Sequence, residues 1–123
     1  MKKYRVYIAG KLNSMAVDYI KNVHAMLKEA EKVRKAGFSV YVPCLDFLIG
    51  VYAGDYNYKD YFENSISWLE ASDAVYACGN WKDSNGAKKE IERANELGIP
   101  VFYDLENLVN WREQEMKKKS KRR

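Results

Sequence analysis

The stretch Asp73–Glu90, DAVYACGNWKDSNGAKKE, has the clearest structural pattern of the chain, since a short apolar run leads into a polar turn and then into a helix. The run Ala74–Cys78 is typical of a buried parallel strand. Gly79–Gly86 forms the turn, and Ser84 is a suitable N-cap for a helix that should end at Gly98. Unpaired N–H groups at a helix N-terminus attract negative charge, so this arrangement predicts an anion site.

Glu90 lies in the opening turns of that helix. The helix N-terminus favours the charged form of a nearby carboxyl group, so we expect Glu90 to stay ionised and to act as a nucleophile rather than as a proton donor. The alternative is an ordinary solvated carboxylate that pairs with Lys89 or Arg93. The flanking strand and glycine turn favour the functional interpretation.

Strands and helices alternate along the rest of the chain. Apolar residues recur at helical spacing between Val17 and Val33, between Phe62 and Leu69, and again in Leu105–Met116. Further strands are expected at Arg5–Gly10, Phe38–Val42 and Ile99–Tyr103. The alternation predicts an α/β fold, a Rossmann-like or flavodoxin-like three-layer sandwich with a four- to five-stranded parallel sheet.

A polar loop, Lys11–Ser14, follows the first strand. The carboxyl ends of parallel strands meet at one edge of a sheet, and ligands bind where neighbouring loops part. We therefore expect Lys11–Ser14 and the helix start Ser84–Gly86 to converge on one anion.

The segment Leu45–Lys59 has no clean period and is interpreted as a long functional loop with at most a short helical turn at its start. Aromatic residues gather in and after this loop, and Trp81 adds another in the turn before the helix. Such a cluster suits stacking on a base or contact between subunits, and the sequence leaves both open. The clustered residues are Tyr52, Tyr56, Tyr58 and Tyr61.

Length and composition predict one globular domain over residues 1–116, followed by a basic disordered tail over 117–123. Six of the 21 basic residues fall in this tail, which leaves 15 basic against 17 acidic side chains in the body. The tail is the one segment expected to touch nucleic acid. Cys44 and Cys78 lie in apolar strand contexts, which is typical of reduced thiols in a cytoplasmic protein.

No signal peptide or membrane span is expected, because no apolar run approaches the roughly 20 residues that a bilayer helix needs. His24 is the single histidine, and no cluster of Cys, His and Asp has metal-ligand spacing. We therefore expect neither a metal nor a cofactor.

Three segments carry a resemblance to a known family. These segments resemble the nucleoside 2-deoxyribosyltransferase superfamily. They are VYIAG near the start, WLEASDAVYA in the middle and SNGAKKEIERANELGIPVF towards the end. That group includes 2'-deoxynucleoside 5'-phosphate N-hydrolases and many small bacterial and phage proteins. The similarity covers roughly residues 4–103, and its most specific part is the Ser-x-Gly-x-x-x-Glu turn from Ser84 to Glu90.

The resemblance implies a role for individual residues. The attacking glutamate of the family corresponds to Glu90, and the tyrosine near the sugar corresponds to Tyr7, although strand packing alone would also explain Tyr7. In the phosphate-preferring hydrolases, the serine that helps hold the 5'-phosphate corresponds to Ser84. The expected substrate-binding residues are Gly10, Lys11, Ser14, Ser65, Trp81, Ser84, Asn85 and Gly86.

The sequence departs from the family at Ser65, where the superfamily usually has an aspartate that interacts with the base and assists its departure. Serine is a poor acid, so this departure bears directly on turnover. Asp55, Asp60 and Glu63 are the nearby carboxylates that a displaced substitute would use.

Three functions follow as hypotheses. The first is an enzyme that cleaves or transfers the N-glycosidic bond of a 2'-deoxynucleoside or its 5'-monophosphate. The second is a nucleotide-binding module without turnover, which Ser65 favours. The third is a nucleic-acid accessory protein that acts through the basic tail. The small domains of the superfamily build their pockets at subunit contacts, so a homo-oligomer is expected as well.

Overall fold

The computed structural model describes residues 3–12 and 15–121 of the chain. Within these residues, a four-stranded and fully parallel sheet forms the centre, with the strand order β2-β1-β3-β4. The strands are β1 (Arg5–Ala9), β2 (Ser39–Tyr41), β3 (Ala74–Ala77) and β4 (Val101–Phe102). Each strand lies inside a predicted range, and the predicted three-layer α/β fold is confirmed.

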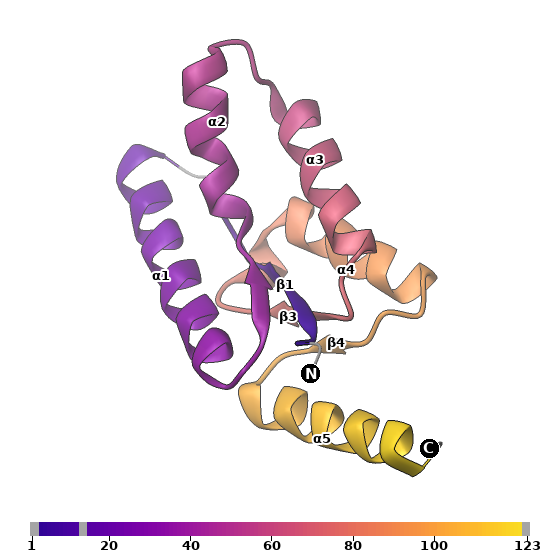
Figure 1. Cartoon of the computed structure of the whole chain (residues 1–123). Helices are drawn as coiled ribbons and strands as arrows, with labels where there is room; N and C mark the ends of the chain where they lie inside the picture. Colours follow the sequence, from indigo (N-terminus) through magenta and orange to yellow (C-terminus); the bar gives the residue numbers. More distant parts are fainter. Residues whose placement is uncertain (1–2, 13–14, 122–123) are drawn as a thin grey trace.

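Helices cover both faces of the sheet (Figure 1). Because successive side chains of a strand point to opposite faces, β1 contributes to two separate cores. Val6 and Ile8 pack with residues of α1 (Ala16–Lys35) and α5 (Leu105–Lys121) on one face. Tyr7 and Ala9 pack with residues of α3 (Tyr58–Glu70) and α4 (Asn85–Glu96) on the other. This two-sided burial explains why the first strand is apolar throughout.

The segment between β2 and α3 is a helix rather than the long loop expected over Leu45–Lys59. A short 3-10 turn, Pro43–Leu45, leads into α2 (Asp46–Ala53), which ends at Gly54 with φ of 81°. Gly50 lies inside α2 at a place with no room for a side chain. A Cβ atom there would overlap the ring and hydroxyl of Tyr61. The glycine that indicated a loop in the sequence therefore serves close packing between α2 and α3.

The closing helix also runs further than expected. The sequence indicated an end at Met116 and a disordered tail from residue 117, whereas α5 continues to Lys121. Lysine has a good helix propensity, and no glycine or proline interrupts this stretch. Positive charge near a helix C-terminus is also favourable. The basic segment is thus the last part of a helix as far as the structure describes it.

The strand order places a switch point between the neighbouring strands β1 and β3. The connection that follows β1 and the connection that follows β3 cover opposite faces of the sheet. The chain after β1 and the chain after β3 therefore part at the carboxyl edge of the sheet. The α2 and α3 helices extend beyond the sheet at this end (Figure 1). A ligand site is expected in the space that these segments enclose.

Candidate functional site

A cavity of about 700 Å³ opens at this carboxyl edge. Gly10 contributes to its wall from the end of β1, Ser65 from α3 and Glu90 from α4. A Cβ atom on Gly10 would lie 3.2 Å from the carbonyl oxygen and the sulfur of Cys78, so glycine permits the close approach of the two strand ends. Aromatic and aliphatic side chains supply most of the remaining lining, which suits a flat, largely apolar ligand group.

Glu90 lines this cavity, and Tyr7 lies behind it, fully buried and not part of the lining. The Tyr7 hydroxyl donates a hydrogen bond to Oε2 of Glu90, and both side chains are buried. Burial, followed by the neighbouring Glu90 carboxylate, raises the pKa of Tyr7 well above its ordinary value. Tyr7 therefore stays a neutral donor that fixes the position of the carboxyl group.

The pKa of Glu90 differs from the sequence-based expectation. Burial raises it from 4.5 to about 7, and the hydrogen bond from Tyr7 opposes this only in part. The helix N-terminus does not keep the group strongly ionised, because Glu90 is the sixth residue of α4 and the dipole acts mainly within the first turn. Near neutral pH both forms of Glu90 are populated, so the same group is able to accept or hold a proton.

A second cavity of about 360 Å³ lies against the start of α4 and shares Tyr58, Ser84 and Gly86 with the first. Ser84 caps the helix, since its Oγ accepts a hydrogen bond from the Ala87 N–H at 3.1 Å. The hydroxyl proton of Ser84 is not used by this cap and is available to an anion. Two lysines, Lys11 and Lys89, line this cavity, and Asp83 is the carboxylate that opposes them.

The structure brings most of the predicted site residues to these two cavities. Gly10 and Ser65 line the larger one, Lys11 and Asn85 line the smaller one, and Ser84 and Gly86 line both. Ser14 lies outside the described residues. Trp81 lines neither cavity, because its ring packs against Tyr103 at 5.2 Å between centroids.

The aromatic cluster divides between the two uses that the sequence left open. Tyr56, Tyr58 and Tyr61 line the larger cavity, where Tyr56 and Tyr61 meet edge to face at 5.0 Å. Tyr52 points elsewhere and is 93% exposed on α2. The part of the cluster that belongs to α3 and the turn before it is therefore placed to contact a ligand, whereas Tyr52 belongs to an exposed apolar surface.

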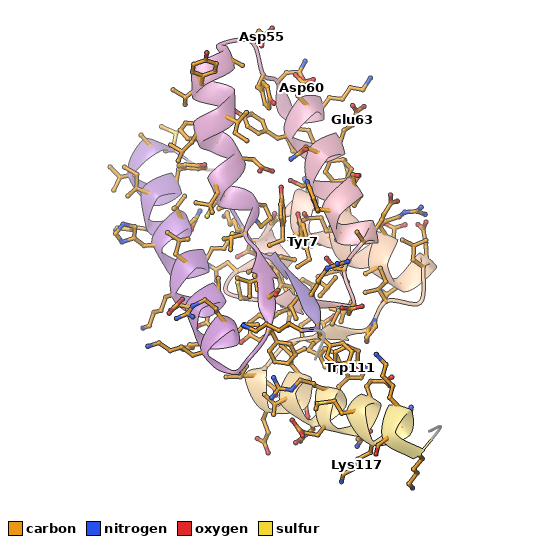
Figure 2. All side chains as sticks on the ribbon, viewed as in Figure 1. Tyr7, Asp55, Asp60, Glu63, Trp111 and Lys117 are labelled. Atoms are coloured by element: carbon orange, nitrogen blue, oxygen red, sulfur yellow. The ribbon has the colours of Figure 1, made fainter. Side chains whose placement is uncertain are left out.

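The substitute carboxylates considered for Ser65 are distant from the site. Figure 2 shows Asp55, Asp60 and Glu63 at the outer end of α2 and α3, away from Tyr7. Asp60 accepts a hydrogen bond from the Asn57 N–H at the start of α3, and Glu63 pairs with Lys59 on the surface. These contacts give both residues ordinary structural roles.

A different carboxylate, Asp46 at the start of α2, lies beside Ser65. The Ser65 hydroxyl donates to Oδ2 of Asp46 at 3.2 Å, and Asp46 is buried. Asp46 was not predicted as a site residue from the sequence. The available signal was a single charged residue in the otherwise apolar stretch that follows β2, in CLDFLIG.

Comparison with solved structures finds a protein with a related fold. A 2-deoxyribosyltransferase from the psychrotolerant bacterium Bacillus psychrosaccharolyticus matches with a TM-score of 0.59 and 25% sequence identity, over 79% of this chain and 69% of that one. The parallel sheet and its carboxyl-edge site thus define a protein of the nucleoside 2-deoxyribosyltransferase-like superfamily, which confirms the resemblance seen in the sequence.

The family assignment is more specific. Residues 4–103 match the family described as a domain of unknown function, DUF4406, and the chain belongs to this family. No match was found among curated proteins. Across the described residues, no helix is both long and apolar enough to cross a membrane.

Proposed function

We propose that this protein breaks, or transfers to an acceptor, the N-glycosidic bond of a 2'-deoxynucleoside or its 5'-monophosphate. The observation that carries the proposal is the buried Glu90 carboxyl group, held by the Tyr7 hydroxyl in the wall of a largely apolar cavity. The similarity to a 2-deoxyribosyltransferase supports nucleoside glycosyl transfer as the general class of chemistry.

In this proposal Glu90 attacks the anomeric carbon of the deoxyribose. The carbon–nitrogen bond breaks, its electron pair leaves with the base, and a bond forms between Glu90 and the sugar. The positive charge that develops on the sugar is stabilised by the ionised carboxylate. Water or a second base then attacks the same carbon and releases Glu90. Tyr7 positions the carboxyl group in both steps through its hydrogen bond.

The smaller cavity supports a preference for the 5'-monophosphate. The first N–H groups of α4 lack partners within the helix, and Lys11, Lys89 and the Ser84 hydroxyl face the same space. A phosphate there would have cationic and hydrogen-bonding partners, with Asp83 as the opposing charge. The two cavities share part of their wall, so one nucleotide is able to occupy both, with its phosphate at α4 and its base among the tyrosines.

A nucleotide-binding protein without turnover is the second candidate. Ser65 lines the cavity where the resemblance leads one to expect an acid for the departing base, and a serine hydroxyl does not supply that proton readily. Such a protein would use the same cavities to sequester or sense a nucleotide.

The experiment that separates these candidates measures free base by chromatography. Purified protein is incubated with each of the four deoxynucleosides and their 5'-monophosphates, with and without a second free base as acceptor. Base release without acceptor indicates a hydrolase, and a new nucleoside formed only with acceptor indicates a transferase. Thermal stabilisation by a nucleotide without any base release indicates the binding module. If the protein releases no base and is not stabilised by any nucleotide, the proposal is overturned.

A further inference from the structure

Asp46 is a buried carboxylate that receives several hydrogen bonds. Its exposed fraction is 8%. The Tyr41 hydroxyl donates to it at 2.7 Å, and the Asn64 amide and the Ser65 hydroxyl each donate at 3.2 Å. Within residues 3–12 and 15–121, the ion pairs involve other acidic residues and none reaches Asp46. Burying a carboxylate without a cation is costly, so the placement of Asp46 points to a role beyond packing.

The direction of the hydrogen bond at Ser65 decides what the cavity wall offers to a ligand. A carboxylate accepts and does not donate, so the Ser65 hydroxyl directs its single proton to Asp46. The lone pairs of Ser65 Oγ are then left for other partners. Ser65 lines the larger cavity together with Glu90, and is itself only 7% exposed. At this point the wall presents a hydrogen-bond acceptor.

Asp46 also reaches the Tyr7–Glu90 pair by a second route. Tyr41 lies opposite Tyr7 in the parallel register of β1 and β2, and the two rings stack with centroids 5.5 Å apart. The Tyr41 hydroxyl is held by both carboxylate oxygens of Asp46. Asp46 therefore fixes the ring against which Tyr7 rests, as well as the hydroxyl of Ser65.

We propose that Asp46 and Ser65 form the recognition pair for an N–H group on the base of the ligand. Ser65 Oγ accepts the hydrogen bond from the base, and Asp46 is the positioning residue that keeps the Ser65 proton directed away from the cavity. This inference rests on the proposed function for the kind of ligand, a nucleoside or nucleotide. It adds that ligands with a donor at this place are preferred over otherwise equal ligands without one.

The test measures dissociation constants by titration calorimetry, so it does not depend on turnover. The probes are the deoxynucleoside monophosphate that binds most tightly and analogues in which one base N–H at a time is replaced by hydrogen or blocked by methylation. In the wild type, loss of the recognised N–H is expected to weaken binding about tenfold. Ser65→Thr keeps the hydroxyl and this difference, whereas Ser65→Ala removes both.

Asp46→Asn makes the stronger test because it keeps the size of the side chain while supplying an amide that donates to Ser65 Oγ. Ser65 is then free to donate into the cavity, and the preference for the N–H ligand is expected to vanish or to reverse. Asp55→Asn makes the same change of charge in an exposed position and serves as the matched control. It is expected to retain the wild-type preference.

The outcomes separate the inference from the proposed function. If Asp46→Asn lowers thermal stability but weakens every analogue equally, Asp46 only holds α2 against α3 and the inference is overturned. If the selectivity changes as expected but no base is ever released, the recognition pair stands and the proposed turnover fails. If base is released and no analogue distinguishes the variants, turnover stands and the pair fails. A wild type that binds none of the probes overturns both.

Discussion

Tyr7 and Glu90 lie 83 positions apart in the sequence and are joined by a buried hydrogen bond from the phenol to the carboxyl group. The parallel sheet makes this possible, because β1 presents Tyr7 to the face that α4 covers. Burial affects the protonation of the two groups differently. Burial keeps Tyr7 protonated, whereas it brings the pKa of Glu90 to about 7, where the group changes charge under ordinary conditions.

The pKa of Glu90 predicts how the stability of the protein depends on pH. The unfolded chain releases this proton near 4.5 and the folded protein near 7, so the folded state binds more protons between these values. The contribution of Glu90 to the free energy of unfolding therefore falls as pH rises from about 4.5 to about 7, and is level outside this window. The total change is about 3 kcal/mol, since one pKa unit corresponds to about 1.4 kcal/mol.

Denaturant unfolding of the wild type and Glu90→Gln from pH 4 to pH 8 checks this dependence. The variant is expected to gain stability relative to the wild type as pH rises. Glu92→Gln, an exposed neighbour on α4, should follow the wild type at every pH. A constant difference between Glu90→Gln and the wild type across the range would show that the Glu90 carboxyl group titrates alike in both states.

The smaller cavity predicts tighter binding of monophosphates than of free deoxynucleosides. Charge-assisted hydrogen bonds to the phosphate are expected to give a difference of at least about tenfold at low salt. The difference should shrink as salt rises, since Lys89 is exposed and Lys11 is only partly buried. Titrations of wild type, Ser84→Ala and Lys89→Gln measure it, with Lys88→Gln as the matched control on the same helix. Equal affinity for both ligand classes, unchanged in Ser84→Ala, would instead indicate a nucleoside pocket.

The exposed face of α2 predicts a homo-oligomer. Leu48 and Val51 are 69% and 61% exposed, and with Tyr52 they form an apolar surface that a second copy of the chain would cover. Light scattering is expected to report at least twice the chain mass of 14.3 kDa. Leu48→Lys should shift the protein towards the monomer, while Gln114→Lys on exposed α5 should not. A wild type that is monomeric at micromolar concentration contradicts this prediction.

The basic end of α5 predicts a separation between small-molecule binding and binding to nucleic acid. Figure 2 shows Lys117 on the side of the molecule away from Tyr7. Truncation after Met116 should therefore leave nucleotide affinity unchanged and remove any salt-sensitive retention on DNA or RNA. It also removes the contact of Lys119 with the Tyr4 ring, at 4.8 Å, which is worth on the order of 0.5–1 kcal/mol.

A second tail variant separates charge from helix length. Changing Lys117, Lys118 and Lys121 to Gln keeps the residues of α5 and removes three positive charges. It should lose part of the nucleic-acid retention, whereas the truncation, which removes all six basic side chains of the tail, should lose all of it. A loss of nucleotide affinity in either variant would mean that the end of α5 contributes to the ligand site.

Local chemistry explains which features the sequence predicted well. Ser84 caps α4 as expected, because a serine hydroxyl satisfies a helix N–H whatever surrounds it. Gly98 ends the same helix region with φ of 74°, a conformation that few other residues adopt. The strands were also predictable from the sequence, because a strand that is buried on both faces appears as a continuous apolar run.

Features that depend on distant contacts were not predictable from the sequence. Gly50 indicated a loop until its contact with Tyr61 was visible. Asp46 gave no sign of its partners, because Ser65 lies on another helix and reaches it only after folding. Glu90 was expected to be ionised from its place in α4, but the burial that raises its pKa comes from elements packed around it.

Glu90 is the attacking group in the proposed reaction, and the rate of base release from a deoxynucleotide in Glu90→Ala shows whether the reaction depends on it. The measurement pairs single-turnover rates with dissociation constants for wild type, Glu90→Ala, Glu90→Gln and the exposed control Glu92→Gln. We predict that both Glu90 variants lose roughly 10³-fold or more in rate while folding and binding the nucleotide, since the attacking group acts in the transition state. The Glu92 variant should keep the wild-type rate. A wild-type rate in Glu90→Ala would exclude Glu90 as the attacking group.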